Sequence, residues 1–266
     1  MAKYVLGRKQ RSTHEDWLDV LANIEQYVSK AEIDTLIERT AADIRKVIGS
    51  GDGVAFAWSG GKDSQAVRFV MESNGIATQC LLGMCNLEYP AFLQWATDNM
   101  PADLEIVNTG QDLNWLAAHP EMLFPQNATI AAKWFHMVQH TAQERYFKKY
   151  NLRMLIMGRR RLEGNYVGEN GVYTTSKGIT RFSPVRDWQH EDILALVYYY
   201  KLPLPPFYGW PRGFRVGSGA WPARQWCNGI QDGWREIAII DRSIVEQAAP
   251  FIDSAYEFLC AASSGS

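Results

Sequence analysis

The sequence lacks the features by which several protein classes are recognised. No two of its four cysteines are two residues apart, so no spacing typical of a zinc site or an iron–sulfur cluster is present. The net charge of −2 excludes a strongly basic nucleic-acid-binding surface, although a local basic patch is still compatible with it. No apolar run is long enough to span a membrane, and the N-terminus lacks the apolar core of a signal peptide. We therefore expect a cytoplasmic protein with no membrane partner.

Apolar stretches alternate with segments of helical periodicity from residue 54 onward. Strand character is found at 54–58, 78–84, 105–108 and 154–157, and helical character at 89–99, 127–149 and 189–200. This alternation predicts an α/β fold with a mainly parallel sheet and helices on both faces. The remaining predicted helices, 15–28 and 31–48, lie before the first strand. We expect three parts: N-terminal helices packed on the core (1–50), the α/β domain (51–209) and a small C-terminal loop and helix region (210–266).

The most informative segment is Ser59-Gly60-Gly61-Lys62-Asp63-Ser64, which joins the first predicted strand to a helix. Glycines let backbone N–H groups approach an anion, and the first turn of a helix offers unpaired N–H donors and a favourable dipole. Lys62 adds a positive charge, and Ser59 and Ser64 add hydroxyl groups. Asp63 follows the lysine where the common ATP/GTP loop has Ser or Thr, so that motif does not match. The segment predicts a site for a nucleotide phosphate at the carboxyl end of a strand.

This segment resembles the PP-loop, Ser-Gly-Gly-x-Asp-Ser, of the ATP pyrophosphatases and the phosphoadenylyl-sulfate (PAPS) reductases. Gly158, Arg160 and Glu163 fit a Gly-x-Arg-x-x-Glu segment of that family. Residues 181–188 are similar to its Pro-Leu-x-Asp-Trp element, with valine in place of leucine, and Asp187 is placed to cap the helix that follows. The resemblance covers residues 50–210 approximately. It implies an adenine-nucleotide site on a five- or six-stranded sheet.

The resemblance also implies roles for individual residues. Those expected near the nucleotide are Ala57, Trp58, Ser59, Gly60, Gly61, Lys62, Asp63, Ser64, Gly83, Met84, Gly158 and Arg160. Those expected to act in catalysis are Lys62, Asp63, Arg160 and Glu163. An arginine can hold phosphate or sulfate through two contacts, and glycine at the strand end permits a close approach of backbone to nucleotide. ATP with Mg²⁺ is the implied ligand, and Asp63 or Glu163 is the nearest carboxylate for the metal.

One departure from the family bears on the chemistry. The reductases carry a C-terminal Glu-Cys-Gly-x-His segment whose cysteine attacks the sulfonucleotide, whereas this chain has Cys227-Asn228-Gly229 without the Glu and the His. No activated thiol is indicated. The leading hypothesis is therefore an ATP-using enzyme in which an oxygen of a second substrate attacks the α-phosphate, giving an adenylated product and pyrophosphate.

Two alternatives remain open. The first is the binding or reduction of a sulfonucleotide, with Cys227 or an external thiol as the reductant. The second is a nucleotide-binding regulatory protein without turnover, for which a Trp- and Arg-rich tail would offer a surface; its tryptophans are Trp210, Trp221, Trp226 and Trp234. The sequence does not identify the second substrate, which could be a small molecule or a nucleic acid. It also leaves open whether the chain forms a homo-oligomer.

Overall fold

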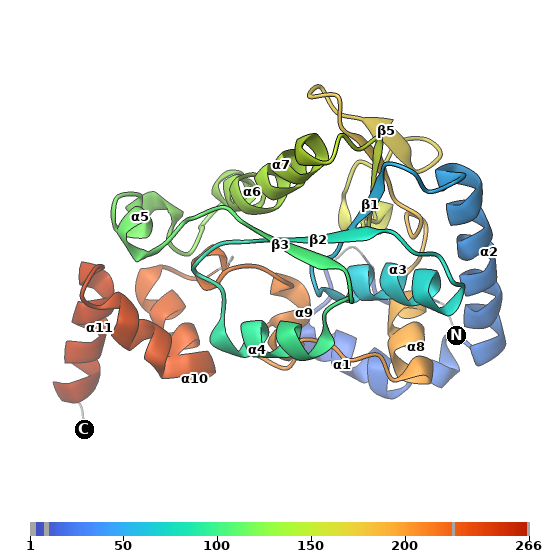
Figure 1. Ribbon diagram of the computed structural model, residues 1–266. Helices are drawn as coiled ribbons and strands as arrows, with labels where there is room; N and C mark the ends of the chain where they lie inside the picture. Colours follow the sequence, from blue (N-terminus) through green and yellow to red (C-terminus); the bar gives the residue numbers. More distant parts are fainter. Residues whose placement is uncertain (1–3, 8–10, 225–226, 265–266) are drawn as a thin grey trace.

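The chain is organised around a six-stranded sheet (Figure 1). The computed structural model describes residues 4–7, 11–224 and 227–264. In spatial order the strands are β3 (Leu104–Asn108), β2 (Gln79–Met84), β1 (Val54–Ala57), β4 (Met154–Met157), β6 (Thr180–Phe182) and β5 (Val172–Thr174). Neighbouring strands are parallel except β5 and β6, which form an antiparallel pair at one edge. The predicted α/β class with a mainly parallel sheet is confirmed.

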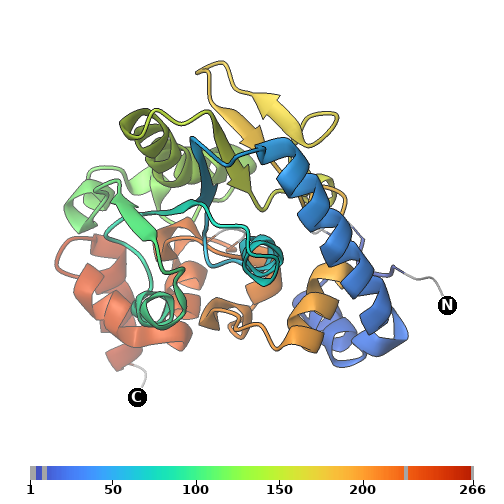
Figure 2. The same cartoon turned by 45° about the vertical axis from the view of Figure 1, so that its right-hand side comes forward.

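Helices cover both faces of this sheet (Figures 1 and 2). One face carries α2 (Lys30–Ile48), α3 (Lys62–Ser73), α4 (Pro90–Asn99) and α8 (His190–Tyr200), and the other carries α6 (Ala128–Phe135) and α7 (Thr141–Lys149). Successive strand residues point to opposite faces. Phe56 and Ile156 therefore join the large core cluster, whereas Leu155 joins Tyr146 of α7 in a smaller one.

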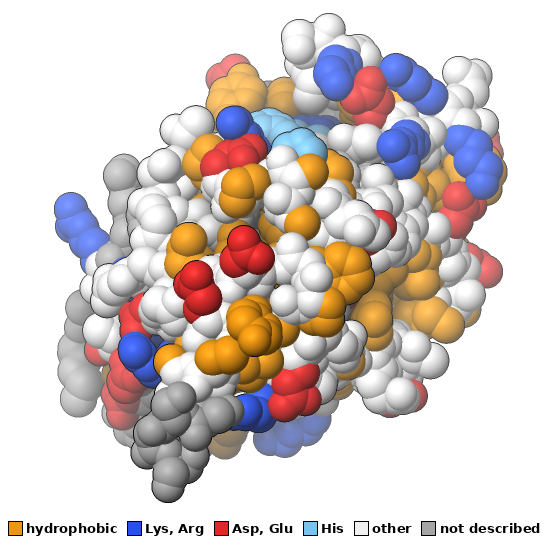
Figure 3. Space-filling model, turned by 90° about the vertical axis from the view of Figure 1, so that its left-hand side faces the viewer, with side chains coloured by type: hydrophobic (Ala, Val, Ile, Leu, Met, Phe, Trp, Pro, Cys, Tyr) orange, Lys and Arg blue, Asp and Glu red, His pale blue; other side chains and the backbone are white. Residues whose placement is uncertain are grey.

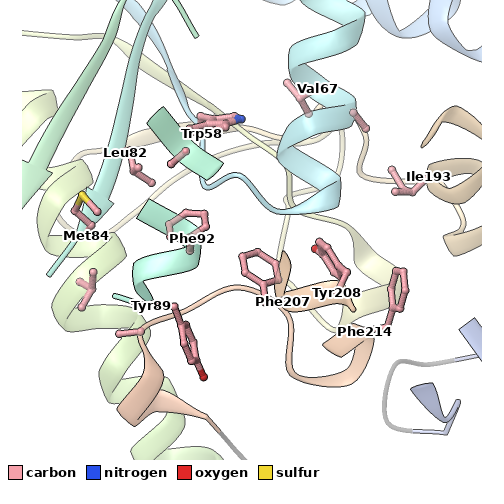
Figure 4. Close-up of a cluster of buried hydrophobic side chains, with 14 of the residues drawn as sticks. Trp58, Val67, Leu82, Met84, Tyr89, Phe92, Ile193, Phe207, Tyr208 and Phe214 are labelled. Carbon is pink, nitrogen blue, oxygen red and sulfur yellow. The ribbon is translucent and has the colours of Figure 1, made fainter. Parts of the chain in front are cut away.

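The large cluster lies directly under the turn that follows β1 (Figure 4). Trp58 is 1% exposed, and its indole stacks against Trp95 with ring centroids 5.9 Å apart. The indole N–H donates a hydrogen bond to the side-chain oxygen of Gln65 in α3 (2.8 Å). Phe207 and Tyr208 approach the same cluster from the C-terminal half of the chain. These contacts fix where the chain leaves the sheet and where α3 begins.

The N-terminal helices contribute buried residues to the large core cluster. The predicted helix 15–28 is shorter in the structure. α1 spans His14–Ala22, and a 3₁₀ turn (Ile24–Gln26) follows it. Trp17 of α1 is fully buried, between the rings of His190 and Phe214. Residues from before the first strand therefore reach the centre of the molecule.

The predicted helix 127–149 is not regular. Between α6 and α7 lies a π-helical turn, His136–His140, which inserts extra backbone into the helix. In this turn the Nδ1 atoms of His136 and His140 lie 2.7 Å apart. The hydroxyl of Thr141 donates to the His136 carbonyl (3.1 Å) and supports the widened turn.

The predicted cap of α8 is wrong. The Asp187 carboxylate pairs instead with Arg161 (2.5 Å) and Arg186 (3.4 Å). The backbone N–H of Gln189, the residue before α8, donates to the side chain of Asp192 in the first turn (2.7 Å). Asp187 is thus held by two arginines outside the helix end.

The rest of the chain forms short elements and a C-terminal helix pair. They are α5 (Leu113–Ala117), α9 (Gly213–Val216), α10 (Ile230–Ala248) and α11 (Asp253–Ser264), with 3₁₀ turns at Pro120–Met122, Arg161–Glu163, Pro206–Tyr208 and Trp221–Ala223. Trp221 and Trp234 are buried in the core, while Trp226 lies outside the described residues. The face over α5, α10 and α11 carries apolar and acidic side chains (Figure 3). No helix within the described ranges is long and apolar enough to cross a membrane.

Candidate functional site

The candidate site lies where the strand order reverses. The chain runs outward from β1 to β2 and β3 on one side, and β4 pairs with the other side of β1. In parallel α/β sheets, ligands bind beyond the carboxyl ends of strands at such a point. The segments that emerge there are 58–61 after β1 and 158–163 after β4. The structure thus places the two strongest sequence motifs side by side.

Four charged side chains, two from the first turn of α3 and two from the segment after β4, form a closed group, which we call the loop cluster: Lys62, Asp63, Arg160 and Glu163. The Lys62 ammonium lies 2.7 Å from Asp63 Oδ2 and 2.9 Å from Glu163 Oε1. The Arg160 guanidinium lies 2.7 Å from Asp63 Oδ1 through Nε, and its Nη2 lies 3.3 Å from Glu163 Oε1. The four residues predicted to be catalytic are therefore in direct contact.

The loop cluster carries no net charge, because two cations face two carboxylates. Lys62 is 3% exposed and Arg160 is 0% exposed. Burial opposes the charge on both groups, but Asp63 and Glu163 outweigh it and raise the pKa of the lysine and of the arginine. The full positive charge that we expected Lys62 to offer a phosphate is instead matched within the cluster.

Besides its two ion pairs, the Arg160 side chain contacts a backbone carbonyl and a histidine ring. Its Nη1 donates to the backbone carbonyl of Trp188 (3.1 Å), and its Nη2 lies 2.9 Å from His190 Nδ1 at the start of α8. The neighbouring arginines of the Arg159-Arg160-Arg161 run point elsewhere. Arg161 pairs with Asp187 at the surface, and Arg159 lies 2.6 Å from His140 on the α7 side of the sheet. Arg160 alone of the three faces the loop.

The backbone of the loop provides the anion-binding features predicted from the glycines. Gly60 has φ +70°, and a Cβ there would lie 2.9 Å from the Trp95 ring, so this position requires glycine. The α3 helix begins at Lys62, and the residue before it, Gly61, has no side chain to cap the first turn. The Lys62 N–H donates instead to the Tyr208 hydroxyl (2.8 Å). Among the described residues no acceptor outside α3 is found for the N–H groups of Asp63 and Ser64, as is usual in a first turn.

Two serine hydroxyls line the inside of the turn. Ser64 Oγ donates to the Gly61 carbonyl (2.8 Å) and lies 3.2 Å from Ser59 Oγ. These contacts hold the turn closed between its first and last residues. The hydroxyl of Ser218, from the C-terminal segment, would lie 3.4 Å from a Cβ at Gly61, so this segment covers one side of the loop.

The magnesium site expected at Asp63 does not fit this geometry. Both oxygens of Asp63 already contact cations, and Glu163 Oε1 contacts the same two cations. A divalent cation beside Lys62 and Arg160 would meet repulsion instead of a free carboxylate. Within the described residues there is also no group of three or more His, Cys, Asp or Glu side chains that could hold a metal ion. We therefore derive no step through a metal held by this protein.

Four predicted contact residues serve packing in this structure. A Cβ at Gly158 would lie 2.8 Å from the backbone of Asp63 and Ser64, so this glycine lets the end of β4 touch the first turn of α3. We expected Gly158 to lie close to a nucleotide, but it lies close to the backbone of the loop. A Cβ at Gly83 would lie 2.7 Å from Ala142 of α7, and Met84 is buried in the large core cluster. Ala57 is half-buried beside the smaller cluster.

Sequence reasoning missed three aromatic residues that shape the site. Tyr208 accepts the Lys62 N–H, His190 contacts Arg160, and the Trp17 ring lies 5.3 Å from the Lys62 ammonium. A signal existed for Tyr208, because it ends the Leu-Pro-x-Pro-Pro-Phe-Tyr run that follows α8. Nothing local to Trp17 indicates its position, since the contact is set by how α1 packs on α8.

Cys227 is not presented as an activated thiol. It is 5% exposed, and its sulfur lies 3.6 Å from Arg212 Nη2 and 3.7 Å from the Arg224 carbonyl. Burial raises the pKa of the thiol despite the nearby arginines. At neutral pH this cysteine is protonated, which does not suit a nucleophile.

Fold and site together define an α/β protein with a PP-loop at the topological switch point. A family profile described as the phosphoadenosine phosphosulfate reductase domain matches residues 53–217. The chain belongs to this family, which confirms the resemblance drawn from the loop motif. Phosphoadenosine 5'-phosphosulfate reductases from two strains of Aliivibrio fischeri are each 20% identical over 219 residues, covering 80% of this chain and 85% of the relative.

A solved structure supports the fold independently. The crystal structure of phosphoadenylyl-sulfate reductase from Candida auris, a phosphate complex, aligns with a TM-score of 0.51 at 13% identity. The alignment covers 68% of this chain and 92% of that one. At this identity the likeness concerns the arrangement of the sheet and helices.

Proposed function

We propose that this chain binds an adenine nucleotide of the phosphoadenylyl-sulfate class at residues 59–64 and promotes cleavage between its sulfo group and its phosphate. One observation carries the proposal: the first turn of α3 follows a glycine N-cap at the carboxyl end of β1, and no acceptor outside α3 is found among the described residues for the N–H groups of Asp63 and Ser64. A helix start of this kind favours an oxyanion through its donors and its dipole. The names of the relatives add the sulfonucleotide as the class of ligand.

The loop cluster positions these donors in this proposal. Its charges cancel, so Lys62 and Arg160 act on the ligand mainly by holding Asp63 and Glu163, and with them the first turn of α3. Charge that grows on the nucleotide phosphate as the bond breaks is then stabilised by backbone donors that are already in place. On this basis Lys62 and Arg160 are positioning residues.

The sulfo group requires a thiol acceptor, which we assign to a molecule outside this chain. The acceptor thiolate forms a bond to the sulfur of the sulfo group, and the bond from that sulfur to the bridging oxygen breaks. The oxygen and its electron pair stay on the nucleotide phosphate. The buried, protonated Cys227 supports an external acceptor.

The burial of Cys227 also favours a second candidate, the adenylation of a second substrate by ATP. In that reaction an oxygen of a small molecule or a nucleic acid attacks the α-phosphate, and pyrophosphate leaves from the same backbone donors. ATP would be supplied with Mg²⁺, although Asp63 and Glu163 offer the metal no free ligand set. A regulatory nucleotide-binding protein would share the binding step without either reaction.

Gly61→Val tests the binding site. Gly61 has an ordinary φ of −64°, so the substitution leaves the backbone unstrained while its methyl groups fill the space beside Ser218 and Tyr208. We expect PAPS at a hundred times its Kd to stabilise the parent by about 2.7 kcal/mol and to leave Gly61→Val unchanged. Gly7→Val is the matched control, since no atom lies within 4 Å of a Cβ there. Binding by Gly61→Val as tight as that of the parent would refute the site.

Product analysis separates the candidate reactions. With PAPS and dithiothreitol we expect adenosine 3',5'-bisphosphate and sulfite, because the second thiol of dithiothreitol attacks the sulfur that carries the sulfo group, forms the disulfide and releases sulfite. Cys227→Ser should keep the parent rate within about twofold, because the thiol comes from outside. A large loss in Cys227→Ser with binding intact would assign the thiol to this chain. Pyrophosphate and an adenylated product from ATP would favour the second candidate, and tight binding without product would favour the regulatory one.

A further inference from the structure

Two further arginines lie at the same edge of the sheet, on the face that carries α7. We call Arg159 and Arg181 the arginine pair. Arg159 follows β4, and Arg181 belongs to β6, the next strand. Both guanidinium groups contact His140 Nε2, Arg159 Nη2 at 2.6 Å and Arg181 Nη1 at 3.3 Å. Both also donate to the Tyr173 hydroxyl, at 3.0 and 3.3 Å. Two positive charges therefore share the same two acceptors.

No carboxylate neutralises the arginine pair. Within the described residues, every hydrogen-bond partner of the two side chains is neutral, the third being Gln143, whose oxygen accepts from Arg181 Nη2 (3.1 Å). Arg181 is 4% exposed, and the Nε atoms of both arginines are buried without an acceptor. Glu144, the acidic residue that follows Gln143 in α7, is paired with Lys148 and Lys177. Buried cations without a counter-charge are costly, so an anion is the expected partner.

His140 is an acceptor in this group and adds no charge. Its Nε2 receives hydrogen bonds from two guanidinium groups, so the proton of the neutral ring lies on Nδ1 and points to His136 Nδ1. Burial, together with the charges of Arg181 and Arg159, lowers the pKa of His140 to about 3. The ring therefore orients the two arginines at neutral pH without neutralising them or adding to their charge.

The position is accessible and lies next to the candidate nucleotide site. Arg159, His140 and Tyr173 are each partly exposed, so a solute can reach the pair. On the face drawn in Figure 3, histidine side chains are grouped at the surface beside basic side chains. Gln139, the residue before His140, donates to the Gly83 carbonyl of β2 (2.8 Å), which ties the π-helical turn to the strand beside β1.

We propose that Arg159 and Arg181 form a binding site for a tetrahedral oxyanion, a phosphate or sulfate group, distinct from the position held by residues 59–64. Planar guanidinium forks match the spacing of such oxygens, and an anion at the exposed side of the pair would supply the missing negative charge and separate two like charges. The oxyanion has two possible sources, a second phosphate of the bound nucleotide or a separate ion or substrate. The inference concerns residues outside the loop and does not require that the proposed reaction be correct.

Inorganic phosphate and sulfate are the first probes. They are compared with chloride at equal ionic strength, because salt alone also screens two like charges. We expect phosphate to raise the melting temperature of the parent, and Arg159→Gln and Arg181→Gln to bind it about tenfold more weakly or worse. Arg186→Gln is the control, an arginine already paired with Asp43, and should respond like the parent. If Arg181→Gln does not fold, the half-buried Arg159 carries the test.

The absence of phosphate gives a second readout. Removing one of two unneutralised charges relieves repulsion, so Arg159→Gln should melt no lower than the parent in chloride and lower than the parent in phosphate. A merely structural arginine would lower the melting temperature in both buffers. Equal phosphate responses of Arg159→Gln and the parent, or no response of the parent beyond chloride, would overturn the proposal.

The source of the oxyanion is resolved with adenosine 5'-phosphate and adenosine 3',5'-bisphosphate. A preference for the bisphosphate that Arg159→Gln abolishes identifies the second phosphate of the nucleotide. An unchanged preference, together with loss of inorganic phosphate binding, identifies a separate anion. Gly61→Val distinguishes this site from the loop, since it should keep the phosphate response even where it loses the nucleotide. A phosphate response that vanishes in Gly61→Val and survives in Arg159→Gln would refute the arginine pair.

Discussion

Arg159 and Arg160 leave the same strand in opposite directions and enter opposite surroundings. Arg160 meets Asp63 and Glu163, and its charge is matched within the loop cluster. Arg159 meets Arg181 and only neutral acceptors, so its charge is not matched. The comparison shows that a basic run in a sequence does not reveal where positive charge is available to a ligand. Here Arg160, the arginine that fits the family motif, belongs to the scaffold, and its neighbour Arg159 carries the charge that no carboxylate matches.

The two regions also differ in what a substitution should do to stability. Removing one member of a buried ion pair leaves an uncompensated charge and is strongly destabilising. Removing one of two like charges relieves repulsion. A substitution of Arg160 should therefore lower the free energy of unfolding, whereas a substitution of Arg159 should not. The sign of the change distinguishes a scaffold residue from a ligand-binding residue.

The largest effect is expected for Arg160→Met. The change leaves two carboxylates with Lys62 alone and removes the hydrogen bonds to Trp188 and His190. We expect a loss of about 3–5 kcal/mol in the free energy of unfolding, measured by urea denaturation. Arg161→Met, which breaks an exposed pair with Asp187, should cost about 1 kcal/mol or less. Similar small losses in both variants would contradict the assignment of Arg160 to the scaffold.

A smaller loss is expected for Gly158→Ala, which alters the backbone between the two regions. The added methyl would lie 2.8 Å from the backbone of Asp63 and Ser64, so the end of β4 and the start of α3 must move apart. We expect a cost of about 1–3 kcal/mol in urea unfolding and weaker nucleotide binding. Gly7→Ala, with no atom within 4 Å, is the control.

The response of Gly158→Ala to inorganic phosphate tests whether the loop cluster and the arginine pair are independent. The response of Gly158→Ala to inorganic phosphate should survive, because the arginine pair lies on the other face of the strand end. A Gly158→Ala protein as stable as the parent would show that the close contact with α3 is dispensable. Loss of the phosphate response would show that the two regions are not independent.

Local patterns were sufficient to predict the fold class, the loop and its place at the strand ends. Parallel strands leave the sheet at one edge, so residues 59–64 and 158–163 had to meet there. The β5–β6 hairpin was not predicted, because its strands have three residues each and are separated by Thr175–Ile179 with little apolar pattern. The π-helical turn was also missed, since the apolar period of residues 127–149 fits an ordinary helix.

Side-chain partners could not be predicted in the same way. Tyr208 accepts a hydrogen bond from a residue 146 positions earlier in the chain, and Trp17 contacts Lys62 through the packing of α1. Three consecutive arginines look equivalent in a sequence, but the end of β4 sends Arg159 and Arg160 to opposite sides. The charge available at each site depends on these tertiary contacts, so the sequence predicted the positive charge of Lys62 but not that Asp63 and Glu163 match it.

The smallest expected effect is a pH dependence that arises from His140 in the arginine pair. The pKa of His140 is lowered to about 3 in the fold, against an ordinary value near 6.5, by burial and by the facing charges of Arg181, Arg159, His136 and Lys177. Between these values the unfolded chain binds the proton and the folded chain does not, so stability falls as pH falls below about 6.5. Because His140 is partly exposed, we expect it to contribute a loss of about 1 kcal/mol between pH 7 and pH 5.5. Glu88 contributes with the opposite sign in this range, because burial raises its pKa to about 7. The His140 contribution is therefore the difference between the parent and His140→Gln, measured as urea unfolding at each pH, and His119→Gln, a histidine stacked on Trp115 away from both regions, should show no such difference from the parent. A parent profile that His140→Gln leaves unchanged would show that His140 is not held neutral between the arginines.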